Sequence, residues 1–240
     1  VLDFPKNAQT GKCKYVPTAV NFVRSYIAFP APKEDALKAA AELINKAQKP
    51  LALVGQGVEL GNAQEELKAF LEKANIPAGR TMLGLSALAS SHPLNVGMLG
   101  MHGNLAPNLK QQEADVIIAI GMRFSDRVTG NLQTYLKQAK VIHLDIDNAE
   151  IDKNVKTDVA IVADCKESLP RLTELINEAN HQEWIDSFKP LQEREIKRVV
   201  EKAIHPKEGK LLMGEVVNAV AEATQGNGVT VTDVGQNQLF

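Results

Sequence analysis

Residues 116–130 read VIIAIGMRFSDRVTG, an apolar run that changes abruptly into a charged loop. Residues 116–120 carry no polar side chain, which is typical of a strand covered on both faces of a sheet. Arg123, Asp126 and Arg127 follow shortly after its end. Because open α/β sheets bind ligands at the carboxyl ends of their strands, the stretch predicts either an anion site or a surface loop whose charges pair with one another.

Short apolar segments alternate with amphipathic ones on both sides of this stretch. We expect strands at residues 51–55, 76–79, 115–121, 139–147, 158–164 and 228–233, and helices over 33–49, 62–74, 105–113, 169–179 and 212–220. Asn62 is the expected N-cap of the second helix, with Glu65 at the capping-box spacing. Alternating strands and helices imply right-handed crossovers, so the predicted fold is α/β, with a doubly wound, mostly parallel sheet flanked by helices.

The glycine-rich stretch from residue 80 to residue 104 shows little periodicity, so we expect it to be mostly loop. It contains Gly84, Gly97, Gly100 and Gly103. A loop of this length inside a compact domain is usually functional.

Both ends of the chain look cut. It begins VLDFPKNAQT, without an initiator Met or an apolar leader, and ends TDVGQNQLF, directly after an expected strand. We therefore expect a piece of a longer polypeptide with four parts. These are the end of an upstream domain with a proline-rich connecting segment (1–33), a central α/β domain (34–180), a charged helical linker with a further helix (181–228) and the start of a downstream domain (229–240).

Charge and cysteine content narrow the function classes. With 27 basic and 29 acidic residues, the net charge of −2 argues weakly against nucleic acid or an anionic membrane as the partner. No apolar run approaches the 18 residues of a membrane span. Cys13 and Cys165 lie far apart and His102 has no second ligand nearby, so we predict free thiols in a reduced, cytoplasmic compartment and no metal site in this chain.

The turn after the first expected strand reads VGQGVELGN. Gly55, Gly57 and Gly61 give G-x-G-x-x-x-G between a strand and a helix, where backbone amides can approach a phosphate. A plain tight turn is an equally good interpretation. NAD binding is disfavoured, because the spacing is one residue too long and no acidic residue lies about 20 residues further on.

Two other regions are candidates for ligand contact. GMLGMHGN at 97–104 combines glycines with methionines and a histidine, and is either a ligand-binding loop or a flexible one. Asp145, Asp147 and Asp164 lie at the ends of expected strands. Carboxylates at such positions either accept hydrogen bonds from ribose hydroxyls or cap the helix that follows. Because all these signals fall on one edge of one sheet, they jointly favour a dinucleotide-like cofactor site.

Two longer stretches resemble a known family. GMLGMHGNLAPNLKQQEADVIIAIGMRFSDRVTGNL (97–132) and VIHLDIDNAEIDKN (141–154) resemble the central domain of the large catalytic subunit of acetohydroxyacid synthase, also called acetolactate synthase. The resemblance spans the whole chain. VLDFPKNAQ is similar to the end of that family's pyrimidine-binding domain, and TDVGQNQLF to the start of its pyrophosphate-binding domain.

This resemblance implies an activity and its partners. The family decarboxylates pyruvate with thiamine diphosphate and Mg²⁺ and joins the product to a second 2-ketoacid, giving acetolactate or acetohydroxybutyrate for branched-chain amino-acid synthesis. Its central domain holds FAD, which takes no net redox part. A homo-oligomer with a regulatory small subunit is implied. The family's catalytic glutamate and its GDG…N metal motif match nothing in these 240 residues, so we expect the fragment alone to be inactive and to bind no thiamine diphosphate.

The resemblance also assigns residues. The implied flavin contacts are Arg24, Gly55, Gln56, Gly57, Thr81, Met82, Leu99, Gly100, Met101, His102, Gly121, Met122, Arg123, Phe124, Ser125, Asp145, Ile146, Asp164 and Cys165. Asp126 and Arg127 would face the substrate channel. The family usually has RFDDR where this chain has RFSDR, so Ser125 replaces an acidic residue; since a hydroxyl still forms hydrogen bonds, we expect FAD binding to survive.

Three alternatives remain. A pyruvate oxidase-like relative would use its flavin as an electron acceptor. A stand-alone nucleotide-binding or regulatory module would need natural ends at these termini. An NAD-dependent deacylase on a related fold is less favoured, because the chain has no zinc-binding cysteines.

Overall fold

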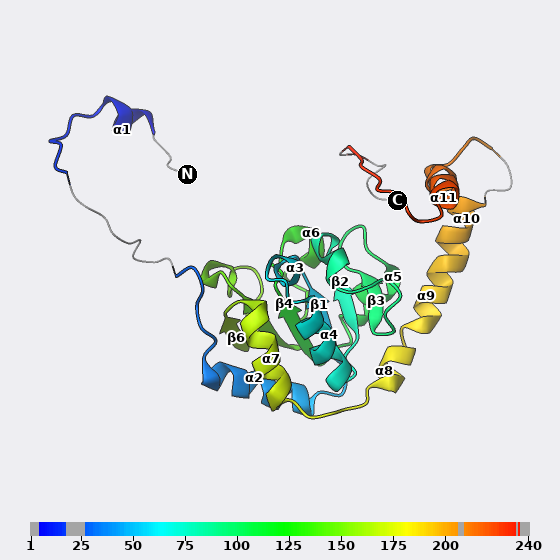
Figure 1. Ribbon diagram of the computed structural model, residues 1–240, viewed down its shortest axis with the longest axis horizontal. Coiled ribbons are helices and arrows are strands. Elements are labelled where there is room, and N and C mark those ends of the chain that lie inside the picture. The colour runs from blue at the N-terminus through cyan, green and yellow to red at the C-terminus, as the bar shows by residue number, and fades with distance from the viewer. Residues whose placement is uncertain (1–4, 18–26, 206–208, 234, 236–240) are drawn as a thin grey trace.

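The computed structural model describes residues 5–17, 27–205, 209–233 and 235. Their centre is a six-stranded sheet with the order β3-β2-β1-β4-β5-β6 (Figure 1). All neighbouring strands are parallel. The strands are β1 Pro50–Val54, β2 Ala78–Arg80, β3 Asn95–Met98, β4 Val116–Ile120, β5 Lys140–Asp145 and β6 Val159–Val162. The predicted α/β class with a doubly wound parallel sheet is confirmed.

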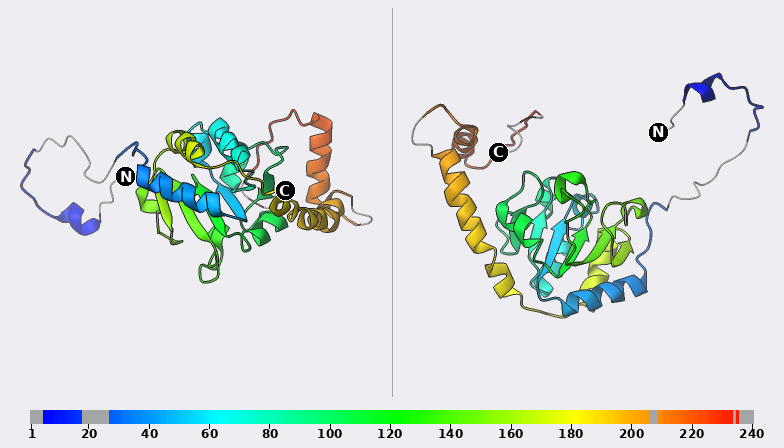
Figure 2. Two further views of the ribbon diagram at one scale, coloured as in Figure 1. Left: turned by 90° about the horizontal axis from the view of Figure 1, so that it is seen from below. Right: turned by 180° about the vertical axis from the view of Figure 1, so that it is seen from behind.

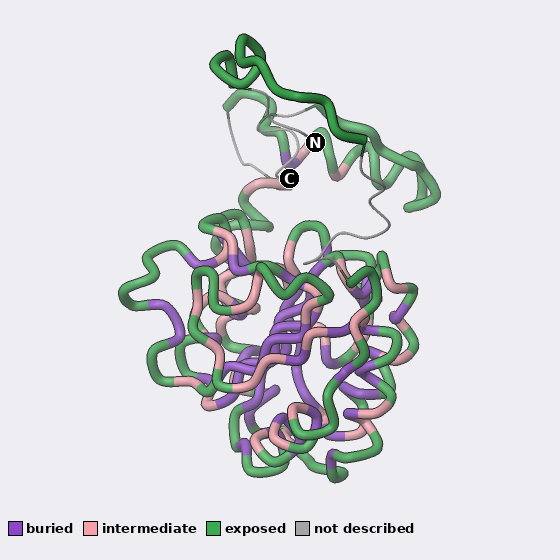
Figure 3. The backbone as a smooth tube through the Cα atoms, turned by 90° about the vertical axis from the view of Figure 1, so that its left-hand side faces the viewer, coloured by how far each residue is buried: buried purple, intermediate pink, exposed green. Residues whose placement is uncertain are grey.

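Three helices cover one face of the sheet: α2 (Glu34–Lys46), α4 (Gln64–Lys73) and α7 (Cys165–Leu175). The left view of Figure 2 shows them on the same side of the strands. Each helix is amphipathic and turns its apolar side chains toward alternate residues of the strands, such as Val54, Ile118 and Ile142, which are fully buried. Figure 3 shows the buried residues concentrated in these central strands.

The opposite face is covered by α5 (Leu105–Lys110), by residues 131–139 and by α8 (Gln182–Asp186). Trp184 on α8 donates its indole N–H to the carbonyl oxygen of Pro50 at 2.9 Å, and its ring meets that of Phe188 edge to face. Both aromatic rings are buried. The stretch after residue 180 is therefore not only a charged linker, because its first turns belong to the core.

Beyond Phe188 the chain continues as α9 (Lys189–Glu195), which still packs against the domain, since Leu191 contacts the core and the Glu195 carboxylate accepts the Leu105 amide at 3.1 Å. The π-helical turn η3 (Ile196–Val200) and α10 (Glu201–Ile204) follow and lead away from the sheet (Figure 1). The predicted helix at 212–220 is present as α11 (Met213–Thr224). The predicted strand at 228–233 is wrong. These residues are described and form no strand, and the side chains of Val229 and Val231 are almost fully exposed, with no strand beside them in the described part of the chain. The division into four parts stays a prediction.

The loop expected between residues 80 and 104 contains regular structure. It includes the 3₁₀ helix η1 (Met82–Ala87) and the edge strand β3, which pairs with β2 across an irregular register. The predicted N-cap was also wrong, because the residue before α4 is Ala63 and not Asn62. Asn62 instead lies in the turn that follows the short helix α3 (Gly57–Leu60), with a left-handed φ of 50°. The connecting segment contains a five-residue helix, α1 (Lys6–Thr10), that has no buried side chain.

Candidate functional site

The site is built where the sheet reverses its winding. After β1 the chain crosses toward β2, and after β4 it crosses toward β5, so the two loops diverge from neighbouring strands. Ligands of doubly wound sheets bind in the crevice at such a point. Here the backbone N–H of Gly57 donates to the Gly121 carbonyl at 2.8 Å, which ties the two loops together.

Glycine is required on both sides of this contact. A Cβ atom on Gly55 would lie 2.3 Å from the Gly121 carbonyl oxygen and 2.4 Å from the Cβ of Met122. One on Gly57 would lie 2.7 Å from the Gly121 Cα. The first two glycines of the G-x-G pattern therefore allow two backbones to touch, which supports the tight-turn interpretation of their spacing.

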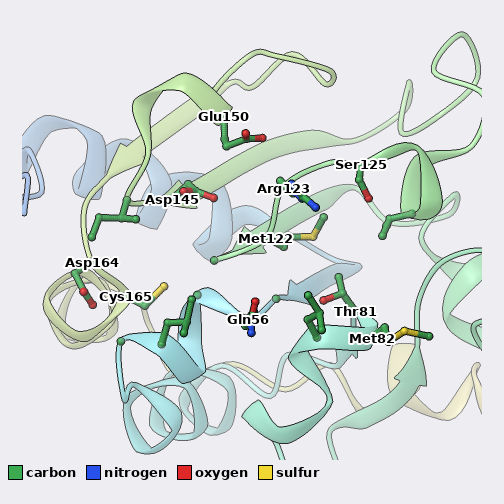
Figure 4. A pocket seen from close by; sticks show the side chains of 18 of the residues that line it. Gln56, Thr81, Met82, Met122, Arg123, Ser125, Asp145, Glu150, Asp164 and Cys165 are labelled. Atoms are coloured by element: carbon green, nitrogen blue, oxygen red, sulfur yellow. The ribbon is translucent and has the colours of Figure 1, made fainter. Parts of the chain in front are cut away.

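A pocket of about 760 Å³ opens at this point, along the carboxyl edge of the sheet. Figure 4 shows Asp164 and Cys165 at one end and Ser125, Thr81 and Met82 at the other, with Arg123 and Met122 between them. The predicted residues that line it are Gly55, Gln56, Gly57, Thr81, Met82, Gly121, Met122, Arg123, Ser125, Arg127, Asp145, Ile146, Asp164 and Cys165.

Other predicted residues lie elsewhere. Leu99 is buried in the core against Gly79, and Met101 and His102 are exposed on the turn after β3. Gly100, Phe124 and Asp126 also do not line the pocket. The turn after β3 nevertheless contacts the loop that follows β4, because the Met101 amide donates a hydrogen bond to the Arg127 carbonyl. The flavin contacts of Leu99, Gly100, Met101, His102 and Phe124, and the place of Asp126 in a substrate channel, stay predictions. Arg24 lies outside the described residues.

Sequence reasoning missed part of the pocket wall. Phe29, Leu60, Leu83, Val128, Glu150 and Ala163 also line it, whereas Gly61, which lines it too, is the third glycine of the predicted G-x-G-x-x-x-G turn. Of these, Leu60 is 74% exposed and Leu83 is 61% exposed, so the rim is apolar and uncovered. Leu60 and Leu83 stand directly beside Gly61 and Gly84, and this proximity to the candidate glycines is the signal that could have found them.

Arginines dominate one side of the pocket. Arg127 pairs with Asp126 at 3.4 Å, but both side chains are exposed and the pair contributes little stability. Arg123 is exposed, and in the described ranges it has no carboxylate partner. Ser125 precedes the short helix α6 (Asp126–Thr129), and its hydroxyl forms no hydrogen bond with other described residues. The loop therefore offers a free guanidinium and a free hydroxyl to a ligand.

Acidic groups gather on the other side. Asp164 caps α7 by accepting from the Lys166 amide at 2.8 Å, and Asp147 caps the 3₁₀ turn η2 (Asn148–Glu150). The capping interpretation thus holds for both. Asp145 is different: it lines the pocket, and burial raises the pKa of its carboxyl group despite the hydrogen bond from the Asp147 amide.

The thiol at this end is unreactive. Cys165 is buried at the start of α7. Burial, followed by the negative charges of Asp164 and Asp145, raises the pKa of the Cys165 thiol to about 12. The thiolate form is therefore absent at neutral pH, and the sulfur contributes only apolar surface to the pocket.

A histidine lies directly beneath the arginine loop. His143, on β5, is fully buried, and its Nε2 is 2.8 Å from the carbonyl oxygen of Met122. Because a carbonyl oxygen only accepts, Nε2 carries the proton. Burial lowers the pKa of His143, outweighing the Met122 carbonyl and the Asp145 carboxylate 3.8 Å away. The ring is neutral at pH 7, and its contact with Asp145 is not an ion pair.

The lowered pKa of His143 predicts a loss of stability on mild acidification. A histidine in the unfolded chain takes up a proton near pH 6.5, while folded His143 remains neutral to lower pH. The unfolded state then binds more protons, so the free energy of unfolding falls as the pH decreases below about 6.5. We expect a His143→Gln variant to lose less stability than wild type between about pH 7 and 5.5, measured by urea denaturation. Equal losses in both proteins would contradict this.

No group of three or more His, Cys, Asp or Glu side chains is placed to hold a metal ion within the described part of the chain. None of the helices in those same ranges has the length and apolar character needed to cross a membrane.

Comparison with known proteins agrees with this geometry. Residues 37–172 match the family described as "Thiamine pyrophosphate enzyme, central domain". The whole chain is 37% identical to acetolactate synthase isozyme 1 large subunit of Escherichia coli (strain K12), covering 100% of this chain and 41% of that protein. It is 37% identical to the probable acetolactate synthase large subunit of Methanocaldococcus jannaschii and 33% identical to the acetolactate synthase large subunit of Buchnera aphidicola subsp. Schizaphis graminum, with 42% of each covered.

The chain thus spans about two fifths of the length of these relatives. The family match includes β1 to β6 and, except for Phe29, the residues that line the pocket. The chain belongs to the thiamine pyrophosphate enzyme central-domain family.

Proposed function

We propose that the pocket at the carboxyl edge of the sheet binds FAD, within a full-length protein that acts as an acetolactate synthase. The observation that carries the cofactor proposal is Arg123, a guanidinium without a carboxylate partner in the described ranges, facing a pocket at the switch point of a doubly wound sheet. A diphosphate supplies the missing negative charge.

The other walls fit the remaining parts of a flavin dinucleotide. Asp145 and Glu150 offer carboxylate oxygens to ribose or ribitol hydroxyls. The uncovered apolar rim, including Phe29, Leu60 and Leu83, suits a flat aromatic ring. When bound, FAD would supply a redox-capable isoalloxazine, while the residues of this chain bind and orient it.

The activity rests on the relatives' names. Proteins called acetolactate synthase large subunit align with the whole chain, which supports pyruvate and a second 2-ketoacid as substrates and thiamine diphosphate with Mg²⁺ as further cofactors. The words "large subunit" support a partner small subunit. The groups that bind thiamine diphosphate and its metal would come from parts of the protein outside this chain.

The test uses the full-length protein with thiamine diphosphate and Mg²⁺. We expect a bound-flavin absorbance spectrum after addition of FAD, and acetolactate formed from pyruvate without bleaching of that spectrum. Bleaching of the flavin by pyruvate under exclusion of oxygen would indicate a pyruvate oxidase-like enzyme instead. Absence of a bound-flavin spectrum would overturn the cofactor assignment.

A further inference from the structure

The loop that follows β4, residues 121–125, is attached to the fold by side chains as well as by backbone. The Nε2 atom of His143 lies 2.8 Å from the Met122 carbonyl oxygen. The Nδ2 atom of Asn154 lies 2.7 Å from the Phe124 carbonyl oxygen. Both nitrogens donate, because carbonyl oxygens only accept.

These two bonds flank Arg123. The side chains of Met122 and Phe124 are both buried, whereas that of Arg123 is exposed. The carbonyl of Arg123 itself accepts the Ser125 amide at 2.9 Å. The backbone on each side of Arg123 is therefore anchored below the pocket, while only its side chain projects into it.

His143 occupies a position where an apolar residue would pack. Its neighbours on β5, Ile142 and Leu144, are fully buried and apolar. Its Nδ1 atom is buried and has no hydrogen-bond partner among the described residues, which costs free energy. The imidazole provides what an apolar side chain lacks, an N–H for the Met122 carbonyl, and its ring meets that of Phe124 edge to face with centroids 5.1 Å apart.

Asn154 reaches the loop from a different direction. It lies after η2, in the connection between β5 and β6, 30 residues from Phe124 in sequence. Asp145, the last residue of β5, and Glu150 in the same connection line the acidic side of the pocket. The Asn154 amide thus links the acidic wall of the pocket to the loop that carries the arginine.

We infer that His143 and Asn154 are positioning residues, which hold the loop of Arg123 through the carbonyl oxygens of Met122 and Phe124 and so fix the guanidinium relative to the acidic wall of the pocket. This inference rests on the proposed function, because the ligand that benefits is the FAD diphosphate. Neither side chain lines the pocket, so each acts through the backbone.

The first test compares FAD affinity in the full-length protein and its His143 variants, by quenching of flavin fluorescence. We expect His143→Leu, which lacks a donor, to raise the dissociation constant about 10-fold. His143→Gln places an amide N–H near the Nε2 position, so it should stay within about threefold of wild type. His92→Leu is the matched control, since His92 also hydrogen-bonds, to Glu72 at 3.1 Å, but outside the FAD pocket. It should leave the affinity unchanged.

The second test uses two asparagines of the same connection. Asn154→Asp removes the donor to Phe124 and should raise the dissociation constant about 10-fold. Asn148→Asp introduces the same charge nearby, at an exposed residue whose side chain forms no hydrogen bond with other described residues. It should leave the affinity within about twofold, which separates loss of the hydrogen bond from charge repulsion.

The outcomes separate this inference from the proposed function. If wild type itself binds no FAD, the cofactor assignment fails and the positioning role fails with it. If wild type binds FAD but His143→Leu and Asn154→Asp bind it equally well, only the inference is overturned. Weak binding by His143→Gln as well would mean that ring packing, not the hydrogen bond, matters. Thermal midpoints of the flavin-free proteins show whether each variant is folded.

Discussion

Replacing Arg123 with alanine is expected to weaken FAD binding by about 10- to 100-fold, because a charge-assisted hydrogen bond to a phosphate contributes about 1.5–3 kcal/mol. The lower end of this range applies if solvent screens the guanidinium in the complex, since its side chain is exposed in the structure. Titration of the full-length protein with FAD, followed by flavin fluorescence, measures the change.

Two control variants make this result specific. Arg123→Lys keeps the charge but loses the forked donor geometry, so it should bind with intermediate affinity. Arg194→Ala removes the same charge from α9, which does not line the pocket, and should bind as wild type does. An Arg123→Ala protein with wild-type affinity would remove the main electrostatic support for the site.

The second large effect is expected from Gly55→Ala. The added methyl group would lie 2.3 Å from the Gly121 carbonyl oxygen and 2.6 Å from the Met122 Cα, so backbone must move to admit it. Overpacking of this kind costs about 3 kcal/mol or more, and the same movement separates the two loops at the switch point. We expect both a lower urea midpoint and loss of FAD binding.

Gly11→Ala is the matched control for this change. Gly11 is exposed, its φ of −68° suits any residue, and an added Cβ would be 3.3 Å from the nearest oxygen. The expected change in stability is below about 0.5 kcal/mol. Should Gly55→Ala prove as stable as Gly11→Ala, the contact between the β1 and β4 loops would not be the constraint that the geometry indicates.

Strong local signals made most of the fold predictable. The uninterrupted apolar runs of β1 and β4 specify strands buried on both faces, and their alternation with amphipathic helices specifies a parallel sheet. The acid-ended strand β5 and the loop after β4 could be placed on one edge for the same reason. Arg123 and Asp145 therefore line one pocket, as expected from the sequence.

The remaining features depend on contacts that no local pattern specifies. β3 contains Asn95 and Gly97 and becomes a strand only through its pairing with β2. Trp184 stands in a polar stretch, and it is buried among residues distant in sequence, including Pro50, 134 positions earlier, whose carbonyl accepts its indole N–H. The family resemblance predicts that GMLGMHGN contacts the ligand as a single loop. In the structure the turn after β3 directs Leu99 into the core and exposes Met101, so these two residues do not share one surface.

The central position of β1 has a consequence during synthesis. Its residues pair with β4 in a register that joins Pro50 to Val116, so the partner strand is made 66 positions later. At ribosomal rates of about 5–20 residues per second, the edge of β1 (PLALV) that pairs with β4 stays unpaired for roughly 3–13 seconds. In that interval it offers unpaired amides and carbonyls to other nascent chains. The strand at the centre of the finished sheet is thus the one that waits longest for a neighbour while the chain is incomplete, because every other pair of neighbouring strands is closer in sequence.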